Sequence, residues 1–248
     1  MISDDPAMRP VIRLVLKAAV CQANVLLVGE SGVGKAYIAG KIHEGYGHGG
    51  VGRNGGGLTP GPFTALFAMP DEDGRPGSDG LVSHLTALEP NGGTVYVRDI
   101  DQLGPRGQRE LLTHLDARER GPGPGDFDHP ARLVFSSQKD LLLESMRGRF
   151  LRQLYLRASV IRINVPPLRT REEDIVSLAR HFVTLFSSRE RKAIVGLSHD
   201  AECLLRNLSW EGNIHELKNT MNRAVVLAER GQVLSAGMFE GAAREAFG

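Results

Sequence analysis

Short apolar runs alternate with amphipathic stretches along the N-terminal part of the chain. The runs that predict strands lie at residues 25–28, 62–68, 94–100, 132–137 and 160–165. Stretches with a helical spacing of apolar residues lie at 8–18, 35–43, 81–88, 111–115 and 141–156. Strands that alternate with helices favour a mostly parallel sheet covered on both faces, so the pattern predicts an α/β fold of three layers. The glycine-rich segments 45–61, 69–80 and 121–130 are expected to be surface loops.

The pattern changes after residue 167. No further strand pattern follows, and three helical stripes are expected instead. Asn213 and Glu216, three residues apart, predict a capping box at the start of the last helix. The sequence therefore predicts an α/β domain at residues 1–167 and a smaller all-helical domain at residues 168–248.

The junction between the first predicted strand and the next helix carries the motif GESGVGK, residues 29–35. Such a loop wraps backbone N–H groups around phosphate, while the helix N-terminus and Lys35 add positive charge. Ala36 replaces the hydroxyl residue that usually follows the lysine and holds Mg²⁺. A glycine-rich turn that binds nothing is the alternative, but the flanking strand and helix favour a phosphate site. The predicted ligands are Gly29, Glu30, Ser31, Gly32, Val33, Gly34, Lys35 and Ala36.

The composition argues against several other classes of protein. A formal net charge of +1 provides no overall field that would attract nucleic acid or an anionic membrane. No window approaches the roughly 20 apolar residues of a membrane helix, and no signal-peptide pattern follows Met1. Cys21 and Cys203 have no expected His or Cys partner at metal-ligand spacing, so no metal site is predicted. The sequence predicts a reduced, cytoplasmic protein that does not contact a membrane.

Segments spread over nearly the whole chain resemble the AAA+ domain of bacterial enhancer-binding proteins, the activators that remodel sigma-54 RNA polymerase. They are GESGVGK (29–35), KIHE (41–44), GPF (61–63), NGGTVYVRDI (91–100), GRFLRQLYLR (148–157), PPLRTREEDI (166–175) and WEGNIHELKN (210–219). The resemblance implies an α/β nucleotide domain with a helical lid, which binds ATP or ADP between the subunits of a ring. The partners it implies are further copies of the chain in a ring or a dimer, and RNA polymerase or a related regulator.

The resemblance places the acidic Walker B pair, one carboxylate for Mg²⁺ and one to activate water, on Arg98 and Asp99. A guanidinium is electrostatically unsuited to organise Mg²⁺, although it can neutralise phosphate charge, so bound Mg²⁺ is doubtful. Asp99 is one methylene shorter than the family's catalytic glutamate, and the asparagine that positions that glutamate corresponds to Phe67. Two alternatives are open for Arg98: contact with phosphate, or an ion pair with Asp99 or another nearby acid.

Other positions of the family's catalytic set have also changed. The sensor Thr-Asn pair corresponds to Ser137-Gln138. The first of two arginine fingers corresponds to Leu151, with Arg152 one place away, whereas the second is kept as Arg157. The lid arginine corresponds to His215, a weaker and pH-dependent cation. The resemblance therefore implies Asp99, Arg152 and Arg157 as catalytic candidates, and further nucleotide contacts at Arg98, Gln138 and His215.

These departures lead to three hypotheses. The first is a nucleotide-binding regulatory domain of a transcription regulator, with weak or no ATP hydrolysis, in which occupancy controls self-association. The second is an active ATPase that remodels sigma-54 RNA polymerase, and the third is a nucleotide-free scaffold or antagonist of a related activator. The first is favoured, because arginine fingers and metal carboxylates each supply orders of magnitude in rate while the phosphate loop remains intact.

Two expectations concern macromolecular partners. The family's sigma-contacting motif GAFTGA is only echoed by GPFTAL at residues 61–66, which falls in the second predicted strand. Contact with sigma-54 is therefore not expected. The segment after the last predicted helix shows no recognition-helix pattern, so no sequence-specific DNA binding by this chain alone is expected.

Overall fold

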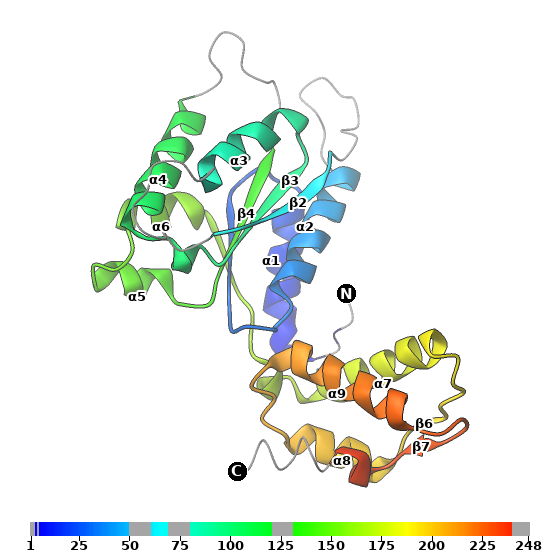
Figure 1. The fold of residues 1–248 in the computed structure, drawn as a ribbon. Helices are drawn as coiled ribbons and strands as arrows, with labels where there is room; N and C mark the ends of the chain where they lie inside the picture. Colours follow the sequence, from blue (N-terminus) through cyan, green and yellow to red (C-terminus); the bar gives the residue numbers. More distant parts are fainter. Residues whose placement is uncertain (1–2, 4, 50–60, 69–79, 121–130, 240–248) are drawn as a thin grey trace. The chain divides into compact units, whose positions relative to one another are not determined.

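The computed structural model describes residues 3, 5–49, 61–68, 80–120 and 131–239 (Figure 1). Its contacts divide the chain into two compact units. The sheet unit comprises Val11–Gly29 and Lys35–Asn164, and the helical unit comprises Met1–Pro10, Glu30–Gly34 and Val165–Gly248. The predicted boundary between residues 167 and 168 stays a prediction.

A parallel sheet forms the centre of the sheet unit. Its strands are β1 (Val25–Val28), β2 (Phe63–Phe67), β3 (Thr94–Arg98), β4 (Arg132–Ser137) and β5 (Ile161–Asn164). They lie in the order β2-β3-β4-β1-β5, and all neighbours pair in parallel. β3 and β4 are buried over nearly their whole length, which explains their continuous apolar runs. The predicted strands and their parallel arrangement are confirmed.

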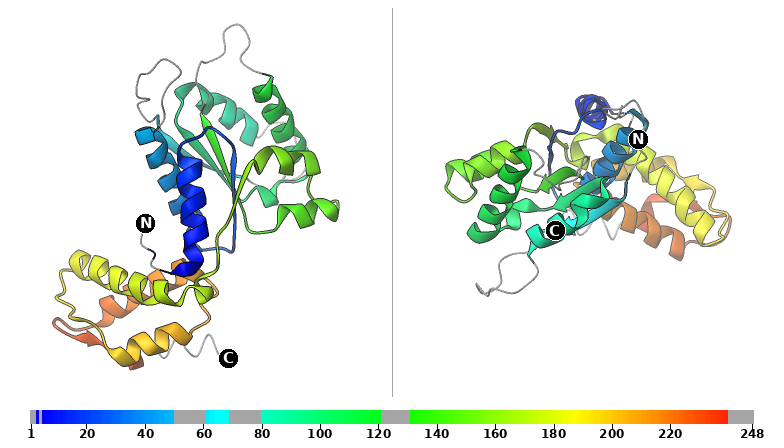
Figure 2. Two further views of the ribbon diagram at one scale, coloured as in Figure 1. Left: turned by 180° about the vertical axis from the view of Figure 1, so that it is seen from behind. Right: turned by 90° about the horizontal axis from the view of Figure 1, so that it is seen from above.

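Helices cover both faces of this sheet (Figures 1 and 2). They are α1 (Arg9–Ala19), α2 (Lys35–Gly49), α3 (Leu81–Leu88), α4 (Pro105–Glu119), α5 (Leu141–Met146) and α6 (Arg152–Ala158). α3 to α6 share one core with the sheet, which includes Leu85, Leu111, Leu141 and Leu154. α1 and α2 lie together on the opposite face. The three-layer α/β fold predicted from the pattern is thus confirmed.

Helix α2 is longer than predicted. It continues through Gly45 to Gly49, so the expectation of a loop from residue 45 is wrong for its first five positions. Gly45 explains the difference, because a Cβ atom there would lie 2.7 Å from the Cβ of Ala19 on α1. This glycine therefore allows two helices to pack closely and does not end one. The loops predicted at 50–60, 69–79 and 121–130 lie outside the described residues.

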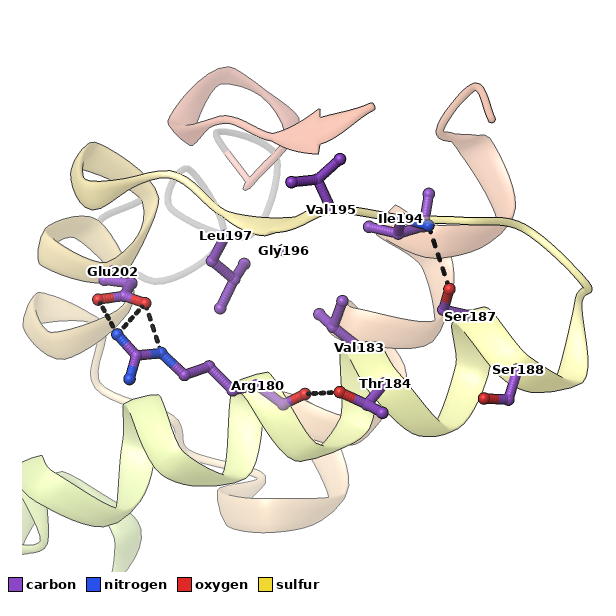
Figure 3. Close-up of a pocket in the computed structure, with 10 residues that line it drawn as sticks. All are labelled: Arg180, Val183, Thr184, Ser187, Ser188, Ile194, Val195, Gly196, Leu197 and Glu202. Carbon is purple, nitrogen blue, oxygen red and sulfur yellow. Dashed lines mark hydrogen bonds and ion pairs between the residues drawn. The ribbon is translucent and has the colours of Figure 1, made fainter. Parts of the chain in front are cut away.

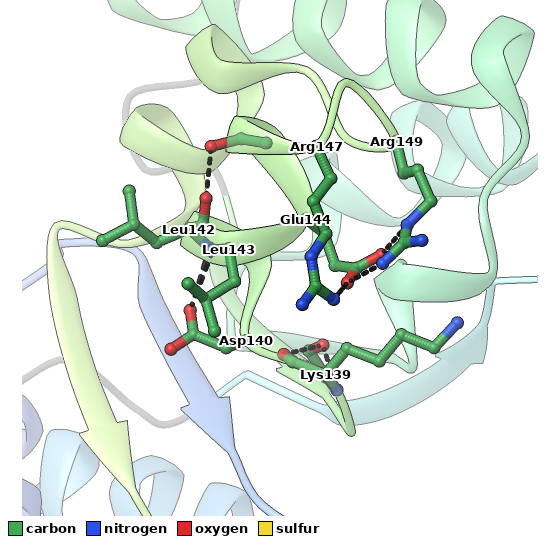
Figure 4. Close-up of polar contacts among 9 residues, drawn as sticks. Lys139, Asp140, Leu142, Leu143, Glu144, Arg147 and Arg149 are labelled. Atoms are coloured by element: carbon green, nitrogen blue, oxygen red, sulfur yellow. Dashed lines mark hydrogen bonds and ion pairs between the residues drawn. The ribbon is translucent and has the colours of Figure 1, made fainter.

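The single helix predicted at 141–156 is two helices, α5 and α6, separated by a turn in which Gly148 has φ +71°. Polar contacts stabilise this break (Figure 4). Before the break, at the start of α5, the Asp140 carboxylate accepts hydrogen bonds from the N–H groups of Leu142 and Leu143. The Glu144 carboxylate accepts two from the Arg149 guanidinium, at 2.6 and 2.7 Å, and a longer one from Arg147. These charged contacts of the turn were not apparent from apolar spacing.

The helical unit contains α7 (Glu172–Arg189), α8 (His199–Asn207) and α9 (Asn213–Leu227). Their apolar stripes meet in one core, as predicted, with Ile175, Phe182, Leu205, Leu217 and Met221 among its buried members. A short parallel pair of strands, β6 (Gly196–Leu197) and β7 (Val233–Leu234), was not predicted. Strands of two residues are too short to show an alternating pattern.

The start of α9 differs in detail from the predicted capping box. Gly212 is the capping residue, and the Glu216 carboxylate accepts a hydrogen bond from its N–H at 2.8 Å. Asn213 was predicted to cap this helix, but it is the first residue after the cap, with φ +55° and full burial. Its amide is used elsewhere, as the site described next shows.

Candidate functional site

The two ends of the glycine loop are fixed within the sheet unit. Gly29 follows β1, and its N–H donates a hydrogen bond to the Ser137 carbonyl of β4 at 3.1 Å. Lys35 begins α2 with a buried side chain, and its Nζ donates to the Gly29 carbonyl at 2.6 Å. The hydrogen bond to Gly29, the first residue of the loop, therefore holds the Lys35 ammonium group against the loop.

The middle of the loop, Glu30–Gly34, is part of the helical unit. Gly32 and Gly34 have φ values of +76° and +99°, in the left-handed region that favours glycine. A Cβ atom at Gly32 would lie 2.1 Å from the Gly212 carbonyl oxygen, so no other residue fits there without a shift. The left-handed glycines agree with a backbone shaped to surround a phosphate group, and the missing side chain of Gly32 allows the turn before α9 to pack closely against the loop.

Residues of the helical unit hold this part of the loop. The Arg169 guanidinium donates to both oxygens of Glu30 at 2.8 and 2.6 Å. The Asn213 amide donates to Glu30 Oε2 at 3.1 Å and to the Ser31 carbonyl at 2.9 Å. The loop carbonyls that follow accept from the Ile214 N–H at 3.0 Å and from Arg171 at 3.5 Å.

Sequence reasoning missed Arg169, Arg171 and Asn213 as loop contacts. All three lie in the segments PPLRTREEDI and WEGNIHELKN, which had been noted only for their resemblance to a family. The sequence did hold a signal for Asn213: asparagine tolerates a left-handed backbone, and its side-chain amide can bond to two separate segments of the chain.

His215, the predicted lid contact, lies on the same side of the loop. Its side chain is exposed, and its Cβ would lie 3.2 Å from a Cβ atom placed on Gly32. The structure therefore brings His215 beside the glycine loop within the helical unit, where its ring has access to solvent.

Arg98 makes a contact that was not considered from the sequence, and its predicted contact with phosphate stays a prediction. Its guanidinium carbon lies 4.4 Å from the centroid of the Phe67 ring, a cation–π contact across the paired strands β2 and β3. Asp99 follows with φ +54°, and its N–H donates to the Ser136 hydroxyl at 3.1 Å. Arg98 and Phe67, which the resemblance assigns to two positions of the family's catalytic set, thus stack on each other.

The polar residues at the end of β4 make local contacts. Ser137 is buried, and its hydroxyl donates to the Lys139 carbonyl at 2.7 Å. The Gln138 N–H donates to the Asp101 carboxylate at 3.1 Å, while the Gln138 side chain is exposed. Gln138 remains a candidate for contact with a ligand at this end of the sheet.

The residues present do not fit Mg²⁺. Ala36 has no hydroxyl, and Arg98, which the resemblance assigns to the Walker B position, is a cation stacked on an aromatic ring. Among the described residues, no group of three or more His, Cys, Asp or Glu side chains could hold a metal ion. Cys203 does have a histidine neighbour that was overlooked in the sequence, His199, whose Nε2 lies 3.6 Å from the sulfur.

Both candidate fingers lie on α6. Arg157 forms ion pairs with Asp116, at 3.0 Å, and with Glu119, both on α4. These three residues line a hollow of about 440 Å³. Arg152 is the exposed first residue of the same helix. The structure thus shows Arg157 neutralised by acids of its own sheet unit.

A second hollow, of about 410 Å³, lies in the helical unit between α7 and the segment around β6 (Figure 3). Arg180 on its wall pairs with Glu202 at 2.7 and 2.8 Å. The Ser187 hydroxyl accepts from the Ile194 N–H at 3.2 Å. None of the predicted site residues lines this hollow.

Comparison with known protein families gives matches along the chain. Two models described as a sigma-54 interaction domain match residues 1–51 and 63–168, and a model described as an AAA+ ATPase lid domain matches residues 169–246. The chain belongs to the sigma-54 interaction AAA+ family. The family inferred from the motifs is therefore confirmed, and so is the helical lid that follows the sheet unit.

Similar proteins include two bacterial regulators. The chain is 34% identical over 232 residues to the transcriptional regulatory protein ZraR of Klebsiella oxytoca, which covers 92% of this chain and 52% of that protein. It is 34% identical over 242 residues to the regulatory protein AtoC of Escherichia coli, with coverages of 92% and 50%. The chain spans about half the length of the curated relatives it matches.

Solved structures show the same fold. NtrX from Brucella abortus in complex with ADP matches with a TM-score of 0.75 at 24% identity, covering 96% of this chain and 55% of that chain. NtrX in complex with ATP matches with a TM-score of 0.73 at 22% identity, covering 96% and 56%. In the part of the sigma-54 interaction domain that the structure describes, no helix is both long and apolar enough to cross a membrane.

Proposed function

We propose that this sigma-54 interaction domain binds ATP or ADP at residues 29–35 and that occupancy controls its self-association within a transcription regulator. The observation that carries the proposal is the glycine loop between β1 and α2, with two left-handed glycines and Lys35 at the start of the helix. NtrX, a protein of the same fold, was crystallised with ADP and with ATP, which supports a nucleotide as the ligand.

Slow or absent hydrolysis is the second part of the proposal. It is supported by the stacking of Arg98 on Phe67, which places a cation and an aromatic ring at positions where the family uses polar catalytic groups. Asp99 is then the carboxylate proposed to orient the water molecule for ATP hydrolysis. Arg98 is proposed to neutralise phosphate charge where other members bind a metal ion, so nucleotide binding does not require Mg²⁺.

Self-association is the third part. Arg152 and Arg157 on α6 are the cations proposed to reach the nucleotide of a neighbouring copy in a ring or dimer. Arg157 must leave Asp116 and Glu119 to do so, and two ion pairs therefore oppose that contact. No sigma-54 contact is proposed, because four of the six residues of GPFTAL belong to strand β2.

Equilibrium binding of fluorescent ATP and ADP tests the nucleotide proposal. Lys35→Ala is expected to weaken binding more than about tenfold, because a charge-assisted contact to phosphate is lost. Lys218→Ala, which removes an exposed lysine of α9, is the matched control and should bind as the wild type does.

The alternatives give distinct results in the same preparation. ATP turnover well above background that disappears in Lys35→Ala would establish an active ATPase. Binding of neither nucleotide at millimolar concentration would contradict the proposal and favour a nucleotide-free scaffold. Sedimentation with and without ADP reports whether occupancy changes self-association.

A further inference from the structure

Five hydrogen-bonding groups of the described lid residues donate to acceptors of the glycine loop. Arg169 and Asn213 donate to the Glu30 carboxylate. The carbonyls of Ser31, Gly32 and Val33 accept from the Asn213 amide, the Ile214 N–H and the Arg171 guanidinium in turn. Three successive peptide groups are therefore held by their oxygen atoms.

The direction of these hydrogen bonds determines where the N–H groups of the loop point. In a planar trans peptide the C=O and the following N–H point in opposite directions. A lid that holds the carbonyls of residues 31–33 therefore turns the N–H groups of residues 32–34 away from itself. Those N–H groups are the ones that a glycine loop offers to phosphate.

Asn213 is the residue best placed to control this arrangement. Its side chain is fully buried, and its Oδ1 accepts a hydrogen bond from the Leu168 N–H at 2.8 Å. Its Nδ2 donates to the Glu30 carboxylate and the Ser31 carbonyl, and also to the Glu211 carbonyl at 3.2 Å. One amide thus joins the start of the lid, the turn before α9 and the glycine loop.

We infer that Asn213 is a positioning residue of the nucleotide site. It does not touch the ligand; it holds the loop carbonyls so that the loop N–H groups are preorganised for phosphate. The inference rests on the proposed nucleotide binding and adds a residue to it that lies outside the motif. It also makes loop order depend on how the lid is folded at the start of α9.

The substitution Asn213→Asp keeps the hydrogen-bond acceptor of the side chain and removes its donor. The aspartate oxygen still accepts from Leu168, and aspartate tolerates the left-handed backbone at this position. The donors to Ser31 are lost, and a carboxylate is placed beside the carboxylate of Glu30. Asn219→Asp, an exposed position of α9, adds the same charge to the same helix and is the control.

Two measurements on the full chain test the inference. Amide hydrogen exchange in nucleotide-free protein should become faster at residues 30–34 in Asn213→Asp, with α7 and α8 unchanged. The Kd for ADP should rise about tenfold, whereas Asn219→Asp should match the wild type in both measurements. A purely structural role would instead speed exchange throughout the lid core. Exchange in α7 and α8 that rises with that of the loop, or an unchanged Kd for ADP, would overturn the inference.

A second variant covers the case in which Asn213→Asp does not fold. Arg169→Met removes an exposed partner of Glu30, and it should shift loop exchange and ADP affinity in the same direction but less. If loop exchange and ADP affinity in Arg169→Met both equal the wild-type values, the inference that the lid holds the loop is contradicted. If wild-type protein binds no nucleotide, the proposed function fails, while loop exchange in the variants still reports whether the lid holds the loop.

Discussion

Arg98 carries the proposal that hydrolysis is slow or absent. Its guanidinium stacks on the Phe67 ring at the paired ends of β2 and β3. A cation–π contact of this kind stabilises the folded state by about 0.5–1 kcal/mol at an exposed site. The resemblance assigns Arg98 to the position of a metal carboxylate and Phe67 to that of the asparagine that positions the catalytic glutamate, so the two proposed changes lie in contact with each other.

His43 leads to a prediction about pH. Its ring lies 5.5 Å from that of Phe63, its Nδ1 lies 3.0 Å from the Thr94 hydroxyl, and burial lowers its pKa below the usual 6.5. The nearby Glu44 carboxylate acts in the opposite direction but more weakly. The unfolded chain therefore binds a proton at a higher pH than the folded chain does. Stability should fall as the pH drops from about 7 to about 5.

The measurement is the urea midpoint of unfolding at the two ends of this pH range. His43→Gln keeps an amide near Thr94 and cannot titrate, so the loss of stability on acidification should become smaller. Part of it should remain, because burial also lowers the pKa of His114. An identical pH dependence in the variant and the wild type would show that His43 is not the group responsible.

Individual residues also mark the limit of prediction from sequence. The motif at 29–35 predicts a glycine loop from spacing alone, because strand, glycines and lysine are local in sequence. Asn213 could not be placed in the same way, since its contact with Ser31 joins residues 182 positions apart. The stacking of Arg98 on Phe67 likewise depends on a strand register that no local pattern specifies.

At the scale of elements, the apolar pattern predicts the strands better than the ends of the helices. β1, β3 and β4 are continuous apolar runs because helices cover both faces of a parallel sheet. Helix α2 was expected to end near Gly45, because glycine has a low helix propensity. Tertiary packing overrides that propensity, since the glycine lets α2 approach α1.

Helix α2 offers a matched pair of glycines for a test. Gly40→Ala places a methyl group where nothing lies within 4 Å, so it should raise the free energy of unfolding by about 0.5–1 kcal/mol. Gly45→Ala gains the same propensity but meets the Cβ of Ala19 at 2.7 Å, so it should lower the free energy of unfolding. Urea unfolding of both variants checks this, and equal stabilisation by the two alanines would contradict the packing explanation.

At the scale of the whole molecule, the chain combines two units with separate cores. The sheet unit and the helical unit each bury a hydrophobic cluster of their own, and the glycine loop carries residues of both. The change in periodicity after residue 167 predicted a sheet region followed by a helical region, but no local pattern showed that Glu30–Gly34 group with the helical unit. Their assignment to one family followed from motifs distributed over nearly the whole length.

We propose that the phosphate loop binds a nucleotide although Ala36 and Arg98 do not fit a Mg²⁺ site. A thermal-shift titration with ATP and ADP, with and without Mg²⁺, tests it on the wild type and on Lys35→Ala. A ligand that binds only the folded state raises the Tm, by a few degrees at saturating concentration. We expect that rise with or without Mg²⁺ in the wild type, and no rise in Lys35→Ala. A rise that requires Mg²⁺, or no rise at all, would contradict it.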